Sequence, residues 1–381
     1  MASADSLRRR RAWAEVDLGA IRHNAAALHG MAGPAALCAV VKANAYGHGS
    51  VEVARAALGS GASSLAVALV EEGAQLRDEG VSAPILVLSE PPLDAMADVR
   101  ALGLTPTLYT PAAIAVAAKA VADSPDPTPM AVHVKVDTGM HRVGASPANA
   151  VAAAQEVDEC AELVLDGLWT HFAVADEPDD AFTAEQLRRF ADVVSELAAR
   201  GVRSRSLHVS NSAGCLAHPS CRYDMVRCGI ALYGVAPSLS LVGRGDLRPA
   251  LSLRARVSFV KRVGAGEGIS YGLRHRFDRP SIVATVPVGY ADGVPWRLGA
   301  TGGEVLIGGR RRPIAGSVTM DQITVDCGDD TGVSPGDEVV LLGRQGHETV
   351  DAWEWARLVG TIAYEVLCGI GTRVPRTYLS G

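Results

Sequence analysis

The chain has 381 residues, of which 48% are hydrophobic and 20% are charged, and its formal net charge is −6. This length fits two domains, or one barrel with an appended domain, and the composition is that of a globular protein rather than a disordered one. The acidic balance, with no basic stripe interleaved with aromatic residues, argues against nucleic-acid binding. No apolar stretch reaches the length of a membrane-spanning helix.

The cysteines and the N-terminal segment point to a cytoplasmic protein. Seven scattered cysteines, an odd number, do not suggest a disulfide framework, and a reducing compartment is the simpler interpretation. The arginine run at residues 8–11 is followed by a charged strand-like segment rather than by the apolar core of a signal peptide. We expect residues 1–11 to be a basic tail. No metal site is expected, because Cys215, Cys221, His208 and His218 lack the paired spacing of zinc ligands.

Eight short apolar runs alternate with helical patterns across the first two thirds of the chain. This alternation predicts a parallel (β/α)₈ barrel, whose functional residues would lie at the carboxyl ends of the strands. A doubly wound open sheet remains the alternative, although no G-x-G-x-x-G motif follows the first run. The predicted strands are residues 36–41, 64–68, 84–88, 105–108, 130–136, 163–169, 206–209 and 224–228.

A segment rich in proline and glycine, residues 237–249, reads as a linker, and the pattern changes beyond it. Short alternating runs separated by Gly and Asp predict a mainly antiparallel β domain with one helix near residues 351–358. We therefore expect a barrel domain at residues 12–242 and a C-terminal β domain at residues 243–381.

Lys42 is the first candidate functional residue. It follows the apolar run of residues 36–41, and desolvation at the end of such a strand lowers the pKa of an ammonium group. A neutral amine is what condensation with an aldehyde cofactor requires. Taken alone, a lysine at the end of a strand is more often a surface residue.

The segment around Lys42, AVVKANAYGHG at residues 39–49, resembles the cofactor-lysine segment of the alanine racemases. Further matches to this family recur in order along nearly the whole chain. They are KVDTGMHR at 135–142, WTHFA at 169–173, HVSNS at 208–212, RCGIALYG at 227–234, ISYG at 269–272, GYADG at 289–293, Met320-Asp321 and Tyr364-Glu365.

The resemblance implies that the cofactor is pyridoxal 5′-phosphate (PLP). Barrels commonly bind phosphate with the loops after their seventh and eighth strands, where several matching residues fall. Arg227 would face the pyridine nitrogen and leave it unprotonated, because an arginine does not give up its proton. Such a ring is a weaker electron sink, which suits racemisation more than transamination. The implied cofactor-binding residues are Lys42, Tyr46, His171, Ser212, Arg227, Gly229, Ile230 and Tyr364.

The resemblance also implies a two-base racemisation of alanine. Lys42 would act on one face of the substrate, and Tyr271, supported by His171 and Arg227, would act on the other. Tyr271 would come from the partner subunit of a homodimer with composite active sites. Arg142 and the backbone N–H of Met320 would bind the substrate carboxylate, and the supporting residues are Lys135, which is often carbamylated in this family, Asp321 and Tyr290, which narrows the entrance with Tyr364.

The predicted function is therefore the interconversion of L- and D-alanine for peptidoglycan precursors. Ser317, Thr319 and Ala363 depart from residues that are frequent in relatives, which leaves substrate range and inhibitor sensitivity open. The alternatives are a racemase of broader range, acting for example on serine, and a PLP-dependent decarboxylase of the same fold. A non-enzymatic PLP-binding protein would resemble the barrel alone.

Overall fold

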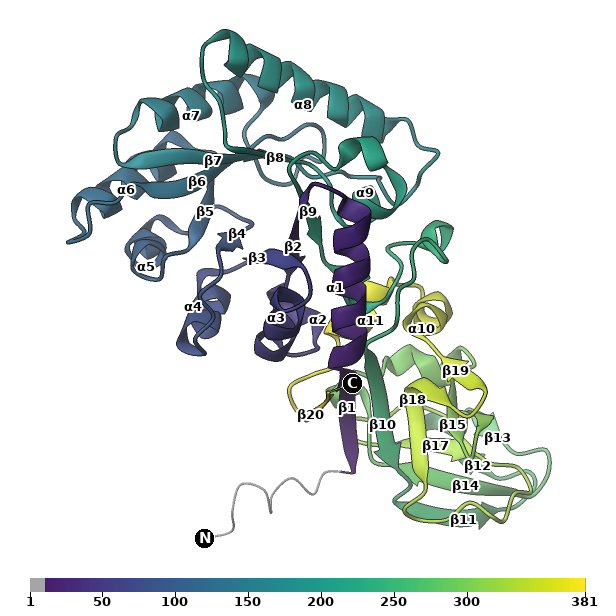
Figure 1. Ribbon diagram of the computed structural model, residues 1–381. Helices are drawn as coiled ribbons and strands as arrows, with labels where there is room; N and C mark the ends of the chain where they lie inside the picture. Colours follow the sequence, from purple (N-terminus) through teal and green to yellow (C-terminus); the bar gives the residue numbers. More distant parts are fainter. Residues whose placement is uncertain (1–10, 381) are drawn as a thin grey trace. The chain divides into compact units, whose positions relative to one another are not determined.

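The computed structural model describes residues 11–380, which divide into two compact units (Figure 1). The barrel unit comprises residues 20–45 and 49–248, and the β unit comprises residues 11–19, 46–48 and 249–380. The basic tail expected at residues 1–11 lies outside the described residues except for Arg11. Among the described residues, no helix combines the length and the apolarity needed to cross a membrane.

The barrel unit is built on eight parallel strands. Neighbours pair in the order β8-β7-β6-β5-β4-β3-β2-β9, so that β9, the last of these strands in the chain, pairs with β2, the first (Figure 1). Between β8 and β9, Asp224 N donates to Leu207 O at 3.0 Å and Arg227 N donates to Ser210 O at 3.0 Å. The strands are β2 (Ala36–Val40), β3 (Ala62–Val67), β4 (Ile85–Val87), β5 (Thr105–Leu108), β6 (Met130–Lys135), β7 (Leu163–Trp169), β8 (Ser206–His208) and β9 (Met225–Cys228).

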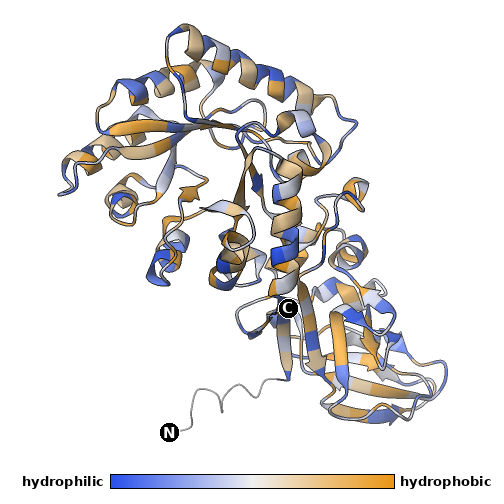
Figure 2. Ribbon diagram, viewed as in Figure 1, coloured by the Kyte–Doolittle hydropathy of each residue, from blue (hydrophilic) through white to orange (hydrophobic). Residues whose placement is uncertain are grey.

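Helices connect these strands and cover their outer side. Figure 2 shows the barrel strands largely in hydrophobic colours, whereas the long helix α8 carries both hydrophobic and hydrophilic residues, as a surface helix should. Thr110 and Ser146 accept hydrogen bonds from the first turns of α6 and α7, and a proline follows each of them. The helices are α1 (Leu18–Ala32), α2 (Lys42–Tyr46), α3 (Ser50–Leu58), α4 (Val70–Asp78), α5 (Met96–Ala101), α6 (Pro111–Ala122), α7 (Pro147–Glu159), α8 (Phe182–Ala199) and α9 (Ser212–Ala217).

The predicted (β/α)₈ barrel is confirmed, and every predicted barrel strand coincides with an observed one to within two residues at each end. The open doubly wound sheet is excluded, because β9 pairs with β2 on one side and is hydrogen-bonded to the β8 segment on the other, which joins the two ends of the sheet. These strands were recognisable because strands of a parallel barrel are buried on both faces and therefore read as continuous apolar runs.

The β unit is mainly antiparallel, as predicted for the C-terminal part of the chain. Its largest sheet has the order β16-β15-β18-β10-β1-β20, a second has the order β11-β14-β17, and β12 pairs with β13. The elements are β1 (Ala12–Asp17), β10 (Leu251–Arg256), β11 (Phe259–Val263), β12 (Gly268–Ile269), β13 (His275–Arg276), β14 (Ser281–Val286), β15 (Glu304–Ile307), β16 (Arg310–Pro313), β17 (Ile323–Asp326), β18 (Glu338–Gln345), β19 (Glu348–Val350), β20 (Arg376–Leu379), α10 (Ala352–Val359) and α11 (Ala363–Cys368).

The expected domain boundary differs from the structure at the N-terminus. Residues 12–242 were assigned to the barrel, but β1 pairs with β10 and β20 and belongs to the β unit. Its side chains alternate between buried and partly exposed, which is the pattern of a sheet with one solvated face and not that of a barrel strand. The barrel unit extends to Arg248, six residues beyond the expected end at residue 242.

Candidate active site

The carboxyl ends of the barrel strands bring five of the sequence-predicted residues together. Lys42 follows β2, Lys135 is the last residue of β6, Arg142 lies in the loop after β6, His171 follows β7, and Arg227 lies in β9. The charges of Arg227, Arg142 and Lys42 all act on both Lys135 and His171. We call the two lysines and two arginines of this set the cation cluster.

The electrostatics of the cation cluster favour an anionic ligand. Burial, followed by the charges of Arg227 and Arg142, lowers the pKa of Lys135 to about 7, and Asp137 opposes this shift. Burial and then Arg227 hold the pKa of His171 well below its usual range, so that its ring is neutral at neutral pH. Concentrated positive charge of this kind raises the local concentration of anions.

The turn that carries Lys42 has an unusual backbone. Residues Ala43, Asn44 and Ala45 have φ of 52°, 52° and 53° with ψ of 48°, 47° and 51°, and Tyr46 has φ of 52°. This is a left-handed helical turn, which costs an L-residue about 1–2 kcal/mol each. Asn44 helps to hold it, because its side-chain oxygen accepts from Ser50 N at 3.0 Å.

Glu72, in the first turn of α4, anchors the same turn from outside. One carboxylate oxygen accepts from Ala43 N at 2.6 Å, and the other accepts from Ala68 N at 2.8 Å and Leu69 N at 3.2 Å. One side chain therefore ties the residue after Lys42 to the end of β3. Sequence reasoning missed Glu72, because its bond to Ala43 spans 29 residues.

Arg227 is almost completely enclosed. Its Nη1 donates to His208 Nδ1 at 2.7 Å and to His208 O at 3.1 Å. Its Nη2 donates to Thr170 O at 2.8 Å and to Val209 O at 3.2 Å, and lies 3.5 Å from His171 Nδ1. Within the described chain the Nε–H has no acceptor. The guanidinium is thus fixed by its two terminal nitrogens, and one donor remains for a ligand.

Trp169, the last residue of β7, contacts two members of the cation cluster. Lys135 Nζ lies 4.3 Å from the centroid of its ring, and the guanidinium carbon of Arg227 lies 4.5 Å from it. An indole face attracts cations, and this attraction is strongest where water is excluded. Trp169 therefore offsets part of the repulsion between Lys135 and Arg227.

Ser212 is joined to the residues after β9 by hydrogen bonds. Ser212 begins α9, and its hydroxyl oxygen accepts from Gly229 N at 2.9 Å and from Ala231 N at 3.4 Å. Gly229 and Ile230 open the 3₁₀ turn that follows β9. The loops after the last two barrel strands are thereby joined at the place where barrel enzymes commonly bind phosphate.

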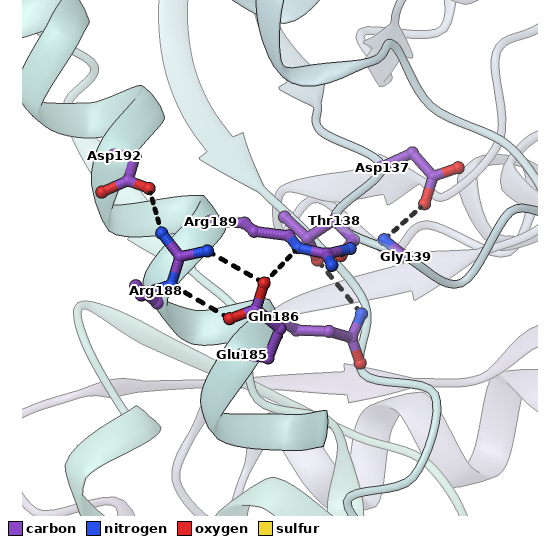
Figure 3. A network of polar contacts seen from close by, with 8 residues as sticks. All are labelled: Asp137, Thr138, Gly139, Glu185, Gln186, Arg188, Arg189 and Asp192. Atoms are coloured by element: carbon purple, nitrogen blue, oxygen red, sulfur yellow. Dashed lines mark hydrogen bonds and ion pairs between the residues drawn. The ribbon is translucent and has the colours of Figure 1, made fainter. Parts of the chain in front are cut away.

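Helix α8 fixes the loops that carry Arg142 and His171 (Figure 3). The buried amide of Gln186 donates to Thr138 Oγ1 and to His171 O, both at 3.1 Å, and its oxygen accepts from Ala173 N at 2.8 Å. Arg189 Nη1 donates to Thr138 O at 3.0 Å, and Glu185 accepts from Arg189. Gln186 is a second supporting residue that the sequence did not reveal.

The β unit brings Tyr271 and Met320 into one pair of loops. Ser270 Oγ donates to Ser317 O at 3.0 Å, and Ser317 Oγ donates to Tyr271 O at 3.2 Å. Ser270 has φ of 62°, and the Tyr271 side chain is 76% exposed. The phenol is therefore presented outwards from a loop whose backbone is held in place.

Tyr290 and Asp321 lie beside the same loops of the β unit. Tyr290 N donates to Thr319 O at 2.9 Å, and Asp321 accepts from Arg373 at 2.7 Å. Gly289 has to be glycine, because a Cβ there would lie 2.2 Å from the carbonyl oxygen of Thr319. Tyr290 also lines a cavity of about 450 Å³.

Tyr46 and Tyr364 form a pair of aromatic rings. Their centroids are 6.2 Å apart, at an interplanar angle of 44°. Tyr46 ends the turn that begins at Lys42, and Tyr364 lies in the first turn of α11. The sequence-predicted residues thus gather in two sets. Lys42, Lys135, Arg142, His171, Ser212, Arg227, Gly229 and Ile230 belong to the barrel unit, and Tyr46, Tyr271, Tyr290, Met320, Asp321 and Tyr364 belong to the β unit.

Two family matches cover nearly the whole chain. The family described as "Alanine racemase, N-terminal domain" matches residues 16–237, and "Alanine racemase, C-terminal domain" matches residues 250–378. The alanine racemase of Symbiobacterium thermophilum is 47% identical over 370 residues, which is 96% of each chain.

Solved structures agree in fold over the same length. An alanine racemase from a D-cycloserine-producing Streptomyces lavendulae superposes with a TM-score of 0.91 at 38% identity, covering 98% of each chain. A histidine racemase from Leuconostoc mesenteroides superposes with a TM-score of 0.89 at 29% identity, covering 98% of this chain and 99% of that one.

Proposed function

The chain belongs to the alanine racemase family, and we propose that it interconverts L- and D-alanine with PLP bound through Lys42. One observation carries this proposal: Lys42 lies in a cluster of cations at the carboxyl end of a barrel. Its relatives named alanine racemase match the chain over nearly its full length. The two parts of the proposal, reaction and cofactor, have separate tests.

The barrel unit has donors suited to each polar group of PLP. The positive charge of the cation cluster and the joined loops of Ser212, Gly229 and Ile230 suit its phosphate. The remaining Nε–H of Arg227 suits its ring nitrogen. PLP, when bound, draws electron density from the α-carbon of an amino acid and so acidifies the proton there.

Arg227 favours the return of a proton to the α-carbon of the substrate over other reactions that PLP supports. A guanidinium donates a hydrogen bond but keeps its proton, so the ring nitrogen stays unprotonated. Burial lowers the pKa of Arg227 to about 10, which still leaves it charged at neutral pH. A weakly electron-withdrawing ring favours early return of a proton to the α-carbon, as racemisation requires.

Two bases serve the opposite faces of the α-carbon in this proposal. Lys42 removes or returns the proton on one face, and the phenol of Tyr271 does so on the other. Tyr271 is 76% exposed and Met320 is 53% exposed, whereas catalytic proton transfer is favoured in a site from which water is excluded. We therefore propose a homodimer in which Tyr271 and Met320 of one copy complete the site of the other. The backbone N–H of Met320 and the guanidinium of Arg142 bind the substrate carboxylate.

Lys135 is suited to carbamylation. A pKa of about 7 leaves roughly half of the side chain as the neutral amine at neutral pH, and the amine is the form that attacks CO₂. A bond from Nζ to carbon forms, one proton leaves to solvent, and the resulting anion neutralises Arg142. Intact mass in bicarbonate buffer should show the added mass of one CO₂, and Lys135→Met should lack it. An unmodified wild-type mass would refute carbamylation.

The decisive assay incubates the protein with L-alanine in deuterated water. Racemisation predicts loss of optical activity together with α-deuteration, whereas a decarboxylase would release CO₂. Borohydride reduction should fix the cofactor to Lys42, as a labelled peptide would show. Serine and histidine as substrates test the broader-range alternative, since a histidine racemase shares the fold. Retention of optical activity would refute the proposal.

We also propose that the product D-alanine supplies peptidoglycan precursors in the cytoplasm. All seven cysteines are unpaired, as in a reducing compartment. Deleting the gene in its host should make growth depend on added D-alanine. Unchanged growth, with no second racemase in the cell, would contradict this role.

A further inference from the structure

A series of hydrogen-bonded polar side chains leads from Arg227 through three adjacent barrel strands. His208 lies at the end of β8, His133 lies in β6, and Asp166 lies in β7. His208 Nε2 is 2.9 Å from His133 Nδ1, and His133 Nε2 is 3.4 Å from Asp166 Oδ2. Both histidines are buried, while the Asp166 side chain is 36% exposed. The chain therefore connects the buried guanidinium to the outside of the barrel.

Only one direction of hydrogen bonding fits these contacts. A guanidinium has no acceptor, so His208 Nδ1, at 2.7 Å from Arg227 Nη1, must accept and carries no proton. In a neutral imidazole the other nitrogen then carries the proton, so His208 Nε2–H donates to His133 Nδ1. His133 Nε2–H in turn donates to the carboxylate of Asp166. Because the guanidinium of Arg227 can only donate and the carboxylate of Asp166 can only accept, the position of each proton between them is determined.

The neighbouring residues hold this arrangement in place. A Cβ on Gly167 would lie 2.4 Å from His133 Nδ1 and 2.6 Å from Cε1, so this position must be glycine to leave room for the ring. The backbone of Gly167 does not require glycine, because its φ is not in the left-handed region. Trp169 stacks on His208 with centroids 5.6 Å apart and an interplanar angle of 10°.

The pKa shifts of His208 and Asp166 agree with this direction of hydrogen bonding. Burial and the charge of Arg227 hold the pKa of His208 well below its usual range, so the ring is neutral. The hydrogen bond from His133 is the largest cause that lowers the pKa of Asp166, which keeps the carboxylate charged. The only cation paired with Asp166 in the described chain is the exposed Arg205, at 3.8 Å.

We propose that His208, His133 and Asp166 form a one-directional hydrogen-bond chain that fixes the tautomers of both histidines and holds Arg227 with its Nε–H turned to the cofactor. His133 and Asp166 are positioning residues, since they act through Arg227. The inference deepens the proposed function and rests on it for the identity of the cofactor. The tautomers and the alignment of Arg227 follow from the protein alone.

The test reads the tautomers directly. Histidine is labelled with ¹⁵N, and long-range ¹H–¹⁵N couplings are recorded on the holoenzyme, with the two rings assigned by His133→Gln and His208→Gln. We expect the Nε2–H tautomer for both rings. Nδ1–H on either ring, or an imidazolium at neutral pH, would overturn the proposal. This readout does not depend on racemase activity, so it separates failure of the chain from failure of the proposed function.

Two variants probe the chain without touching Arg227. Gly167→Ala displaces the His133 ring, and Asp166→Asn removes the charge at the outer end. Both should yield mixed tautomers and weaker PLP binding, and kcat should fall by about ten- to a hundredfold with little change in KM, as for a misplacement of ~1 Å near the chemistry. If Gly167→Ala does not fold, Asp166→Asn alone tests whether the hydrogen-bond chain positions Arg227.

Two control variants complete the experiment. Arg205→Gln alters the exposed charge beside Asp166 and should leave tautomers and kcat unchanged. Gly30→Ala adds a methyl group where nothing lies within 4 Å of the new Cβ, and should also have no effect. Wild-type tautomers and kcat in Asp166→Asn would refute the role of the chain.

Discussion

Replacing Glu72 with alanine should loosen the turn that carries Lys42. The substitution removes the acceptor of three backbone N–H groups, on Ala43, Ala68 and Leu69, at 2.6, 2.8 and 3.2 Å. The left-handed turn after Lys42 then loses the bond from Ala43 N to α4. The matched control is Glu71→Ala, which makes the same change one position earlier in the first turn of α4, where the side chain is exposed.

The magnitude follows from the three bonds. A hydrogen bond to a charged acceptor contributes about 1.5–3 kcal/mol, so three give roughly 5–9 kcal/mol as an upper limit. Glu72 is only half-buried, and water replaces part of what is lost. We expect a decrease of about 2–3 kcal/mol in the free energy of unfolding for Glu72→Ala. For Glu71→Ala, about 0.3–1 kcal/mol is expected from the helix dipole alone.

Urea unfolding and PLP titration measure the two effects. PLP affinity should fall by about tenfold or more in Glu72→Ala, because each 1.4 kcal/mol spent on restoring the turn costs a factor of ten. Ala43→Gly in the Glu72→Ala background should recover part of the affinity, since glycine adopts φ near +52° without penalty. Equal behaviour of Glu72→Ala and Glu71→Ala in both assays would refute the anchoring role.

Three further predictions concern other supporting groups. Gln186→Met should lower the free energy of unfolding by about 2–3 kcal/mol, because buried partners such as His171 O lose their amide, and a stability within ~0.5 kcal/mol of wild type in urea would contradict this. Lys135 binds a proton more weakly in the folded state, where its pKa is about 7, than in the unfolded state. In CO₂-free buffer, the free energy of unfolding should therefore rise between pH 7 and about 10. Lys135→Met should remove that rise and the exposed-site control Lys119→Met should keep it, as urea unfolding across pH would show. Tyr271→Phe should abolish racemisation in both directions while the cofactor spectrum is unchanged, and near-normal turnover would exclude the phenol as a base.

The sequence alone predicted those strands and helices that can be recognised from the pattern of neighbouring residues. The barrel strands are continuous apolar runs, and helix α10 (Ala352–Val359) lies where a helix was expected near residues 351–358. Strand β1 shows the limit of this approach, because its alternating pattern does identify a strand but does not reveal its partners, β10 and β20. A partner more than 200 residues away is set by tertiary packing.

The residues of the candidate site likewise fall into those that the sequence could predict and those that it could not. Residues within recognisable motifs, such as Lys42 and Arg227, could be named in advance. Glu72, Gln186 and Asp166 could not, because each is an ordinary polar residue whose role comes from a contact across the fold. Asp166 bonds a histidine 33 residues earlier in the chain, on the neighbouring strand. Only the barrel geometry places these groups together.

Subunit complementation tests the central claim most directly. Lys42→Ala and Tyr271→Phe are each expected to be inactive as homodimers. If the two bases come from different copies, an equal mixture refolded together contains one intact site in each mixed dimer, and should regain about a quarter of the wild-type sites. If both bases belong to one chain, every site in the mixture carries one defect. Recovered racemase activity near that level is what we predict, and a mixture as inactive as its two components would contradict the composite two-base site.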